Sequence, residues 1–95
     1  MSSSPPLFPP SLIPATTTAQ LPASYTMRPL EAGDYERGFL DVLRVLAPVG
    51  DVSGAAFRER FEWMRQRAGE YYLIVVVDGA AAVVGTGCLV VEKKL

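Results

Sequence analysis

Residues 71–77 read YYLIVVV, an unbroken run of β-branched, aromatic and other apolar residues, and this run constrains the fold more than any other feature of the sequence. Such a run is typical of a strand buried on both faces of a sheet. It is far shorter than the roughly 20 apolar residues that a helix needs to cross a bilayer. Asp78 and Gly79 follow it and favour a hairpin turn. We therefore predict a strand, a turn and a return strand over residues 82–92.

The predicted return strand is apolar and is interrupted by Gly85 and Gly87. Glycine inside a strand indicates a bulge or a place where another backbone or a ligand comes close. The glycines are not followed by a helix start, which a phosphate-binding loop requires, so we expect no such loop here. A long apolar strand at a sheet edge is an aggregation hazard that domains pair or cover. We therefore expect the 95 residues to form one part of a larger sheet.

The first 27 residues differ in composition from the rest of the chain. They hold six of the eight prolines and neither a charged residue nor a glycine. Proline removes backbone hydrogen-bond donors, and no periodic apolar face offsets the entropy of ordering this segment. We expect residues 1–23 to be a disordered Pro/Ser/Thr-rich tail, and residues 24–95 to be the folded part. The tail matches neither a secretory signal nor a mitochondrial presequence, so we expect no targeting role for it.

A short β-prone stretch over residues 25–28 opens the folded part, and Pro29 ends it or confines it to a sheet edge. A first helix is predicted from Asp34, which serves as its N-cap, to the stop signals Pro48 and Gly50. Helical spacing places five of its apolar side chains on one face: Tyr35, Phe39, Val42, Leu43 and Leu46.

A second helix is predicted over about residues 54–67. Ser53 is its N-cap, and Gly69 follows it as a C-terminal stop. The residues at i, i+4 and i+7 that form its apolar face are Phe57, Phe61 and Met64. The element order is thus β-α-α-β-β, and the fold class is α/β (α+β).

The charges are balanced, with 9 Lys+Arg against 10 Asp+Glu and a formal net charge of −1. A nucleic-acid or anionic-membrane surface needs clustered positive charge, whereas the arginines of the second helix alternate with acids, as on a solvated face.

With no histidine and one cysteine, Cys88, neither a disulfide nor a metal site of the usual His/Cys type is expected. We expect Cys88 to be a buried core thiol in a reducing compartment, and Trp63 to be a packing residue. Lys93 and Lys94 either hold a phosphorylated ligand or solvate an edge strand.

Five stretches together carry a resemblance to a known family. They are residues 25–40 (YTMRPLEAGDYERGFL), 46–50 (LAPVG), 57–61 (FRERF), 83–87 (VVGTG) and 90–94 (VVEKK). In this order and spacing the chain resembles the N-terminal half of fungal glucosamine 6-phosphate N-acetyltransferases of the GNAT superfamily. The resemblance covers residues 24–95 and implies a partial GNAT domain.

The resemblance implies transfer of acetyl from acetyl-CoA to the amine of glucosamine 6-phosphate, in UDP-N-acetylglucosamine biosynthesis, by a cytoplasmic homodimer. It implies that Lys94 pairs with the sugar phosphate and that Leu95 takes the next position of the substrate-binding stretch. Ala47 stands where the family usually has threonine, so that contact loses a hydroxyl. The family's catalytic and acetyl-CoA-binding residues correspond to no residue of this chain, and no metal is implied. We therefore expect the 95 residues alone to be inactive.

The apolar edge strand supports an alternative function. An exposed strand edge can pair with another chain by strand addition, which predicts a non-catalytic interaction module.

Overall fold

Strand β2 (Tyr71–Val77) is the centre of a three-stranded antiparallel sheet in the order β1-β2-β3, with β1 at Thr26–Pro29 and β3 at Val83–Val90. The computed structural model describes residues 5–46, 49–67 and 69–91. Two helices, α2 (Phe39–Leu46) and α3 (Gly54–Arg65), lie between β1 and β2 in the chain. The predicted β-α-α-β-β order is confirmed, and β1 lies at a sheet edge as Pro29 indicated.

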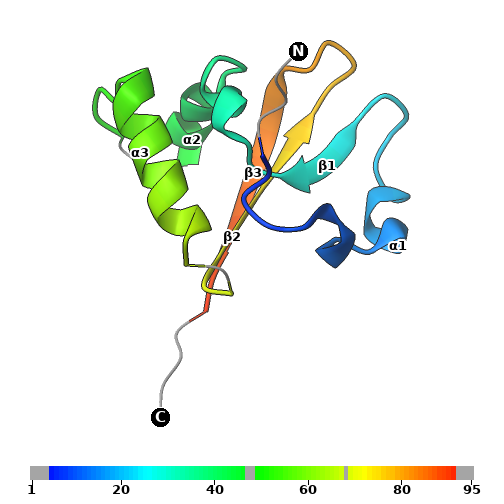
Figure 1. Cartoon of the computed structure of the whole chain (residues 1–95). Coiled ribbons are helices and arrows are strands. Elements are labelled where there is room, and N and C mark those ends of the chain that lie inside the picture. The colour runs from blue at the N-terminus through cyan, green and yellow to red at the C-terminus, as the bar shows by residue number, and fades with distance from the viewer. Residues whose placement is uncertain (1–4, 47–48, 68, 92–95) are drawn as a thin grey trace.

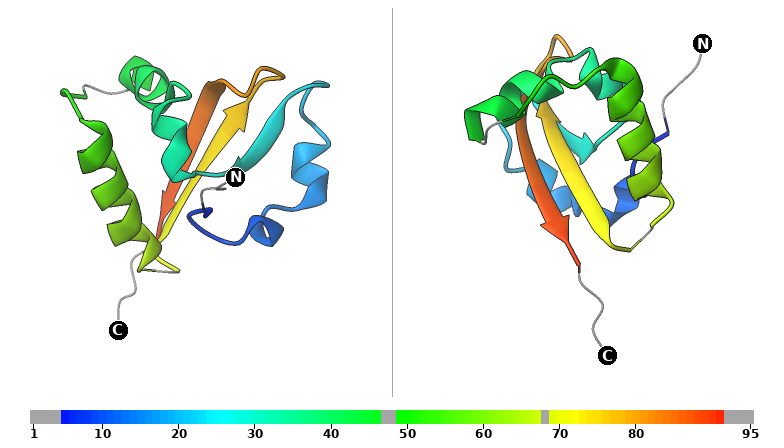
Figure 2. Two further views of the ribbon diagram at one scale, coloured as in Figure 1. Left: turned by 45° about the horizontal axis from the view of Figure 1, so that its top comes forward. Right: turned by 90° about the vertical axis from the view of Figure 1, so that its left-hand side faces the viewer.

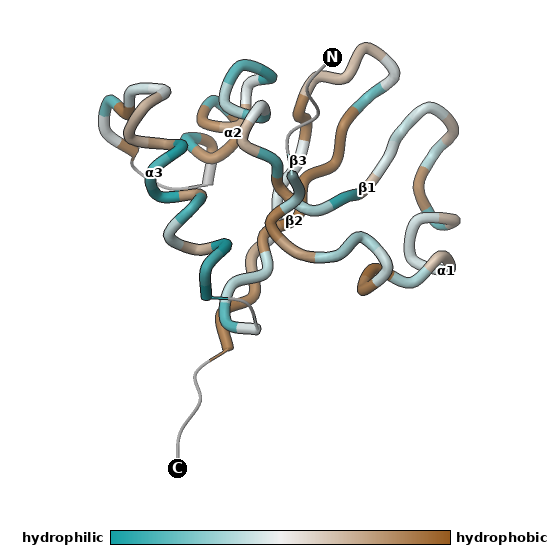
Figure 3. The backbone as a smooth tube through the Cα atoms, viewed as in Figure 1, coloured by the Kyte–Doolittle hydropathy of each residue, from teal (hydrophilic) through white to brown (hydrophobic). Residues whose placement is uncertain are grey.

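The sheet separates two layers (Figures 1 and 2). The helices α2 and α3 pack on one face, and the N-terminal segment lies against the other. Side chains of β2 alternate accordingly, because Tyr71 contacts Trp63 of α3 while Tyr72 contacts Phe8 of the N-terminal segment. Hydrophobic residues concentrate along the strands, whereas α3 is largely hydrophilic (Figure 3).

The N-terminal segment differs from the sequence prediction of a disordered tail. Its described residues include two short helices, η1 (Pro10–Leu12) and α1 (Ala15–Thr18), and the buried side chains of Leu7 and Phe8. The Leu7 amide donates to the carbonyl of Leu30 at 2.8 Å, and the Phe8 ring meets Tyr72 edge-on at 5.3 Å. The prediction required a periodic apolar face, but two adjacent apolar side chains and one strand-like hydrogen bond hold the segment to the sheet.

The predicted first helix is interrupted. A 3-10 turn, η2 (Ala32–Tyr35), comes first, and α2 follows it after Gly38, whose φ of +93° is accessible mainly to glycine. Asp34 is therefore not an N-cap but the third residue of η2. The buried face of α2 begins with Phe39 and Leu40, while Pro48 lies outside the described residues.

Helix α3 follows the prediction closely. The Ser53 hydroxyl accepts the amide of Ala56 at 3.1 Å as an N-cap should, and Gly69 ends the helical region with a φ of +90°. Phe57 and Phe61 are buried, and they anchor α3 in the core. That core joins both helices, β2, β3 and the N-terminal segment in one cluster.

The hairpin between β2 and β3 is wider than two residues. One Asp78 carboxylate oxygen accepts the amides of Ala80 and Ala82 at 2.9 and 3.0 Å, and Ala81 takes a positive φ of 65°. The pairing then shifts where Val76 faces Gly85 and Val77 faces Val83. This is the bulge that the glycines indicated.

Two burial predictions are wrong. Among the residues of β2 only Val75 and Val77 are buried, and partly exposed side chains lie on both faces of the strand. Cys88 is exposed and is not a core thiol, because it lies in the C-terminal half of β3, which is an edge strand of the described sheet.

We predict that Phe8→Ala destabilises the chain by about 3 kcal/mol, since it empties a core position. The matched control is Leu12→Ala in the same segment, where the side chain is 57% exposed against 9% for Phe8. Urea denaturation measures both free energies of unfolding. Equal losses in the two variants would contradict the docking of the N-terminal segment on the sheet.

Candidate functional site

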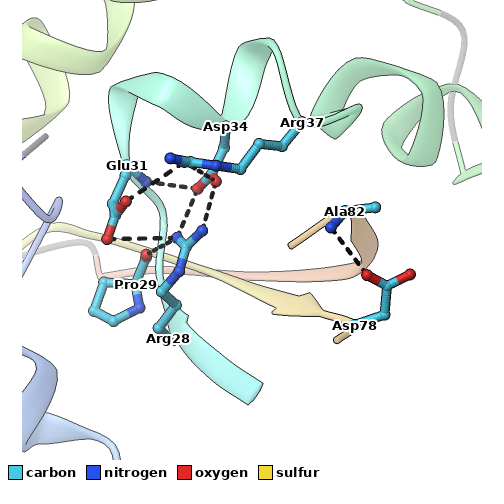
Figure 4. A network of polar contacts seen from close by, with 7 residues as sticks. All are labelled: Arg28, Pro29, Glu31, Asp34, Arg37, Asp78 and Ala82. Atoms are coloured by element: carbon cyan, nitrogen blue, oxygen red, sulfur yellow. Dashed lines mark hydrogen bonds and ion pairs between the residues drawn. The ribbon is translucent and has the colours of Figure 1, made fainter. Parts of the chain in front are cut away.

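Asp34 is the only buried polar or charged residue in the part of the chain that the structure describes. Its carboxylate accepts two hydrogen bonds from the Arg28 guanidinium, at 2.7 and 2.9 Å, and one from Arg37 at 3.0 Å (Figure 4). The Glu31 amide donates a fourth at 2.8 Å. The Glu31 carboxylate lies 3.7 Å from Arg28 and 3.5 Å from Arg37, which completes a four-residue network.

The network keeps Asp34 ionised. Burial by itself raises the pKa of this carboxyl, but the hydrogen bonds from Arg28, the Glu31 amide and Arg37 outweigh it and hold the pKa below its ordinary value. The hydrogen bond to Asp34 likewise raises the pKa of Arg28. Asp34 is thus charged at neutral pH and its oxygens are occupied, which suits a structural link and not a general base.

This link connects strands that are distant in sequence. Arg28 belongs to β1, Asp34 to η2, and the Arg37 carbonyl accepts the amide of Val83 at the start of β3 at 2.9 Å. Between them, the Leu30 amide donates to Leu73 of β2 at 2.9 Å. The Asp34 network therefore fixes where η2 and α2 lie on the sheet.

An open hollow of about 570 Å³ lies beside this region, at the end of the molecule where α2 leads into α3. The Tyr35 hydroxyl donates to the Val52 carbonyl at 2.7 Å and ties η2 to the start of α3. Arg44 lies 3.2 Å from Asp41 and reaches the Gly50 carbonyl at 3.5 Å. The hollow is lined by Tyr35, Gly38, Leu40, Asp41, Arg44, Asp51, Val52 and Ser53.

The three predicted substrate-binding residues, Ala47, Lys94 and Leu95, lie outside the described residues. The stretches next to them are described. Val52 lines the hollow at one end of the sheet, whereas the Val91 amide donates to Glu70 at 2.8 Å, after the end of α3. Because β3 begins beside Arg37 and runs away from α2, the start of α3 and the end of β3 lie at opposite ends of the molecule (Figure 1).

The sequence prediction missed the Asp34 network and assigned Asp34 as a helix N-cap. The available signal was the position of Asp34 between Arg28 and Arg37 in a segment that Pro29 and Gly38 exclude from regular helix. Trp63 is a packing residue as predicted, since it contacts Tyr71 with ring centroids 5.3 Å apart.

Within residues 5–46, 49–67 and 69–91, no group of three or more His, Cys, Asp or Glu side chains is placed to hold a metal ion. No helix in this part of the chain has the length and apolar character needed to cross a membrane.

Comparison with known proteins identifies the relatives of this chain. No family model matches it. It is 39% identical over 75 residues to a glucosamine 6-phosphate N-acetyltransferase of Candida albicans, an alignment that covers 79% of this chain and 50% of that protein. A probable enzyme of the same name in Drosophila melanogaster is 39% identical over 69 residues, which is 72% of this chain and 31% of the relative.

The solved glucosamine-6-phosphate N-acetyltransferase of Arabidopsis thaliana superposes with a TM-score of 0.70 at 30% identity, covering 74% of this chain and 48% of that one. The chain is a partial-length homologue of these acetyltransferases. Its helices and antiparallel sheet match part of the GNAT acetyltransferase fold, as the resemblance implied. It spans half or less of the length of the relatives named here.

We predict that Asp34→Asn destabilises this homologue by about 3 kcal/mol at neutral pH, because it leaves two guanidinium groups facing a neutral amide. The matched control is Asp41→Asn, which removes an exposed carboxylate 3.2 Å from Arg44 and costs about 0.5 kcal/mol or less. Chemical denaturation measures both. Equal effects would contradict the role of the network.

Comparison of Asp34→Asn with the parent chain also tests the pKa of Asp34. Its pKa is lower in the folded chain than the unfolded value of about 4, so its carboxylate stabilises the fold above that pH. This contribution is lost as the pH falls through the folded-state pKa. The difference in unfolding free energy between the parent chain and Asp34→Asn should therefore narrow below about pH 4. A constant difference from pH 7 to acid would contradict the assignment.

Proposed function

We propose that this chain is the amino-sugar-binding half of a glucosamine 6-phosphate N-acetyltransferase, which transfers acetyl from acetyl-CoA to the sugar amine. The similarity that carries the proposal is to relatives of that name at 36–39% identity, in Candida albicans and in rice, Oryza sativa subsp. japonica. The match to the Arabidopsis enzyme at a TM-score of 0.70 supports it independently of the aligned sequences.

The substrate contacts in this proposal come from two stretches. The Lys94 ammonium pairs with the phosphate of the sugar, and Leu95 continues that stretch. Ala47 follows α2 in the sequence, and the residues before and after it that line the hollow include Arg44, Asp51 and Val52. Alanine offers no hydroxyl there, so the connection after α2 contacts the substrate through its backbone or through neighbouring side chains.

The proposed enzyme acts as a homodimer in the cytoplasm. A dimer is favoured by the arrangement of the single chain, in which the start of α3 and the end of β3 lie at opposite ends of the molecule. In a two-fold dimer the connection after α2 of one copy can meet the strand end of the other.

Acetyl transfer also needs groups that the proposal assigns to the part of the relatives that this chain does not match. The amine must lie against the thioester carbon, and a hydrogen-bond donor must stabilise the oxyanion that forms when the amine attacks. Coenzyme A then leaves as the thiolate. We therefore expect the 95 residues to hold no complete acetyl-CoA site.

The direct test extends the chain with the part of the Candida albicans relative that it does not match. This chimera should form N-acetylglucosamine 6-phosphate from acetyl-CoA and glucosamine 6-phosphate, whereas the 95-residue chain should not. Mass spectrometry of the sugar product avoids interference from the Cys88 thiol. Turnover by the 95 residues alone, or none by a chimera that unfolds cooperatively, would contradict the proposal.

Two adjacent lysines test the phosphate contact in the same chimera. Lys94→Gln should raise the KM for glucosamine 6-phosphate about tenfold, since it removes a charge-assisted hydrogen bond worth about 1.5 kcal/mol or more. Lys93→Gln is the matched control and should leave the KM within about twofold, because the proposal assigns no phosphate contact to Lys93. A larger increase in KM for Lys93→Gln than for Lys94→Gln would contradict the assignment of the phosphate contact to Lys94.

A second candidate function rests on β3. Its outer half exposes Leu89 and Val90, at 60% and 51%, and Val84 is also exposed near its start. An interaction module would pair this edge with a strand of another chain. Such a module would form a stable complex with its partner, and the chimera would then have no activity.

A further inference from the structure

Two guanidinium groups lie over the indole of Trp63 on α3. The Arg60 Cζ is 4.3 Å from the ring centroid, and the Arg67 Cζ is 3.8 Å from it. Energetically significant cation–π contacts occur roughly once per 70–80 residues in proteins. Two such contacts on one ring are therefore unusual, and they bring two positive charges to the same indole.

These two arginines differ from their neighbours on the same helix. Arg58 lies 2.6 Å from Glu36, and Arg65 lies 3.5 Å from Glu62. Within the described residues, neither Arg60 nor Arg67 has a carboxylate oxygen within 4.0 Å. Neither guanidinium group is therefore held in an ion pair within the described residues.

The aromatic pair holds the guanidinium groups in place. Trp63 is half-buried and packs on Tyr71 of β2. Arg67 is restrained further, because its Nη1 donates to the Trp63 carbonyl at 3.0 Å. A guanidinium stacked on an aromatic ring keeps the edge that carries its N–H groups available, and it loses less side-chain entropy when a ligand binds.

We propose that Arg60 and Arg67 form a binding surface for the phosphate monoester of a small molecule. At neutral pH a phosphate monoester carries a charge of about −1.5 to −2, which two guanidinium groups can balance. A carboxylate carries a single negative charge and would balance only one of them. The planar N–H fork of arginine also fits two phosphate oxygens at once. This surface shares no residue with the hollow or the Asp34 network, and it stands whether or not the proposed acetyl transfer does.

Trp63 is the only tryptophan of the chain, so its fluorescence reports on the surface directly. We would titrate the 95-residue chain with inorganic phosphate at constant ionic strength and follow Trp63 emission, with phosphorus NMR line broadening as a second measurement. A saturable response is expected, and acetate should bind about tenfold more weakly because it carries one charge. Arg60→Gln and Arg67→Gln should each weaken phosphate binding about tenfold.

Variants on the same helix provide the controls. Arg58→Gln and Arg65→Gln should leave phosphate affinity within about twofold, because their guanidinium groups are paired and exposed. Arg67→Lys keeps the charge but loses the fork, and should weaken binding about threefold. The proposal is overturned by the absence of a saturable response, by equal affinity for acetate, or by equal losses in the Arg65 and Arg67 variants.

Discussion

The buried carboxylate of Asp34 is the interaction on which the rest of this structure depends. An ionised carboxylate inside a protein is costly unless each oxygen has hydrogen-bond partners, and Arg28, Arg37 and the Glu31 amide supply them here. These partners belong to β1, to η2 and to the entry into α2. Satisfying one buried charge therefore sets the path of the chain from the sheet into the helical layer. The hydrogen bonds of Leu30 to Leu73 and Leu7 attach this path to β2 and to the N-terminal segment.

The position of the helices has a functional consequence. By fixing η2 and the start of α2, the network also places the hollow at one end of the sheet, while β3 carries the chain to the other end. A chain that spans about half of its acetyltransferase relatives thus has the hollow and the end of β3 at opposite ends of its described part. The exposed edge of β3 is where additional structure has backbone groups to pair with.

The sequence predicted the elements whose signals are local. The β-branched run of β2, the Ser53 cap and the phenylalanine spacing of α3 each depend on neighbouring residues, and all three are confirmed. It failed where contacts outside the local pattern decide the outcome. Asp34 is a residue type favoured at helix N-caps, but its carboxylate is buried against Arg28 of β1. Phe8 lies in a proline-rich segment but packs on Tyr72. The prediction that Cys88 is buried was wrong, because its burial depends on what lies beside β3, and the residues around Cys88 do not encode that. The substrate residues Ala47, Lys94 and Leu95 came from family resemblance alone and stay predictions.

Amide hydrogen exchange at Glu31 tests most directly whether the buried charge holds this fold together. The Glu31 amide donates to the Asp34 carboxylate at 2.8 Å, outside any ladder of backbone hydrogen bonds. If the network is a fixed part of the core, this amide exchanges only through global unfolding, with the same protection as the amides of β2. Exchange as fast as that of the hairpin amide of Ala80 would show that the carboxylate opens to water independently, and would contradict the account.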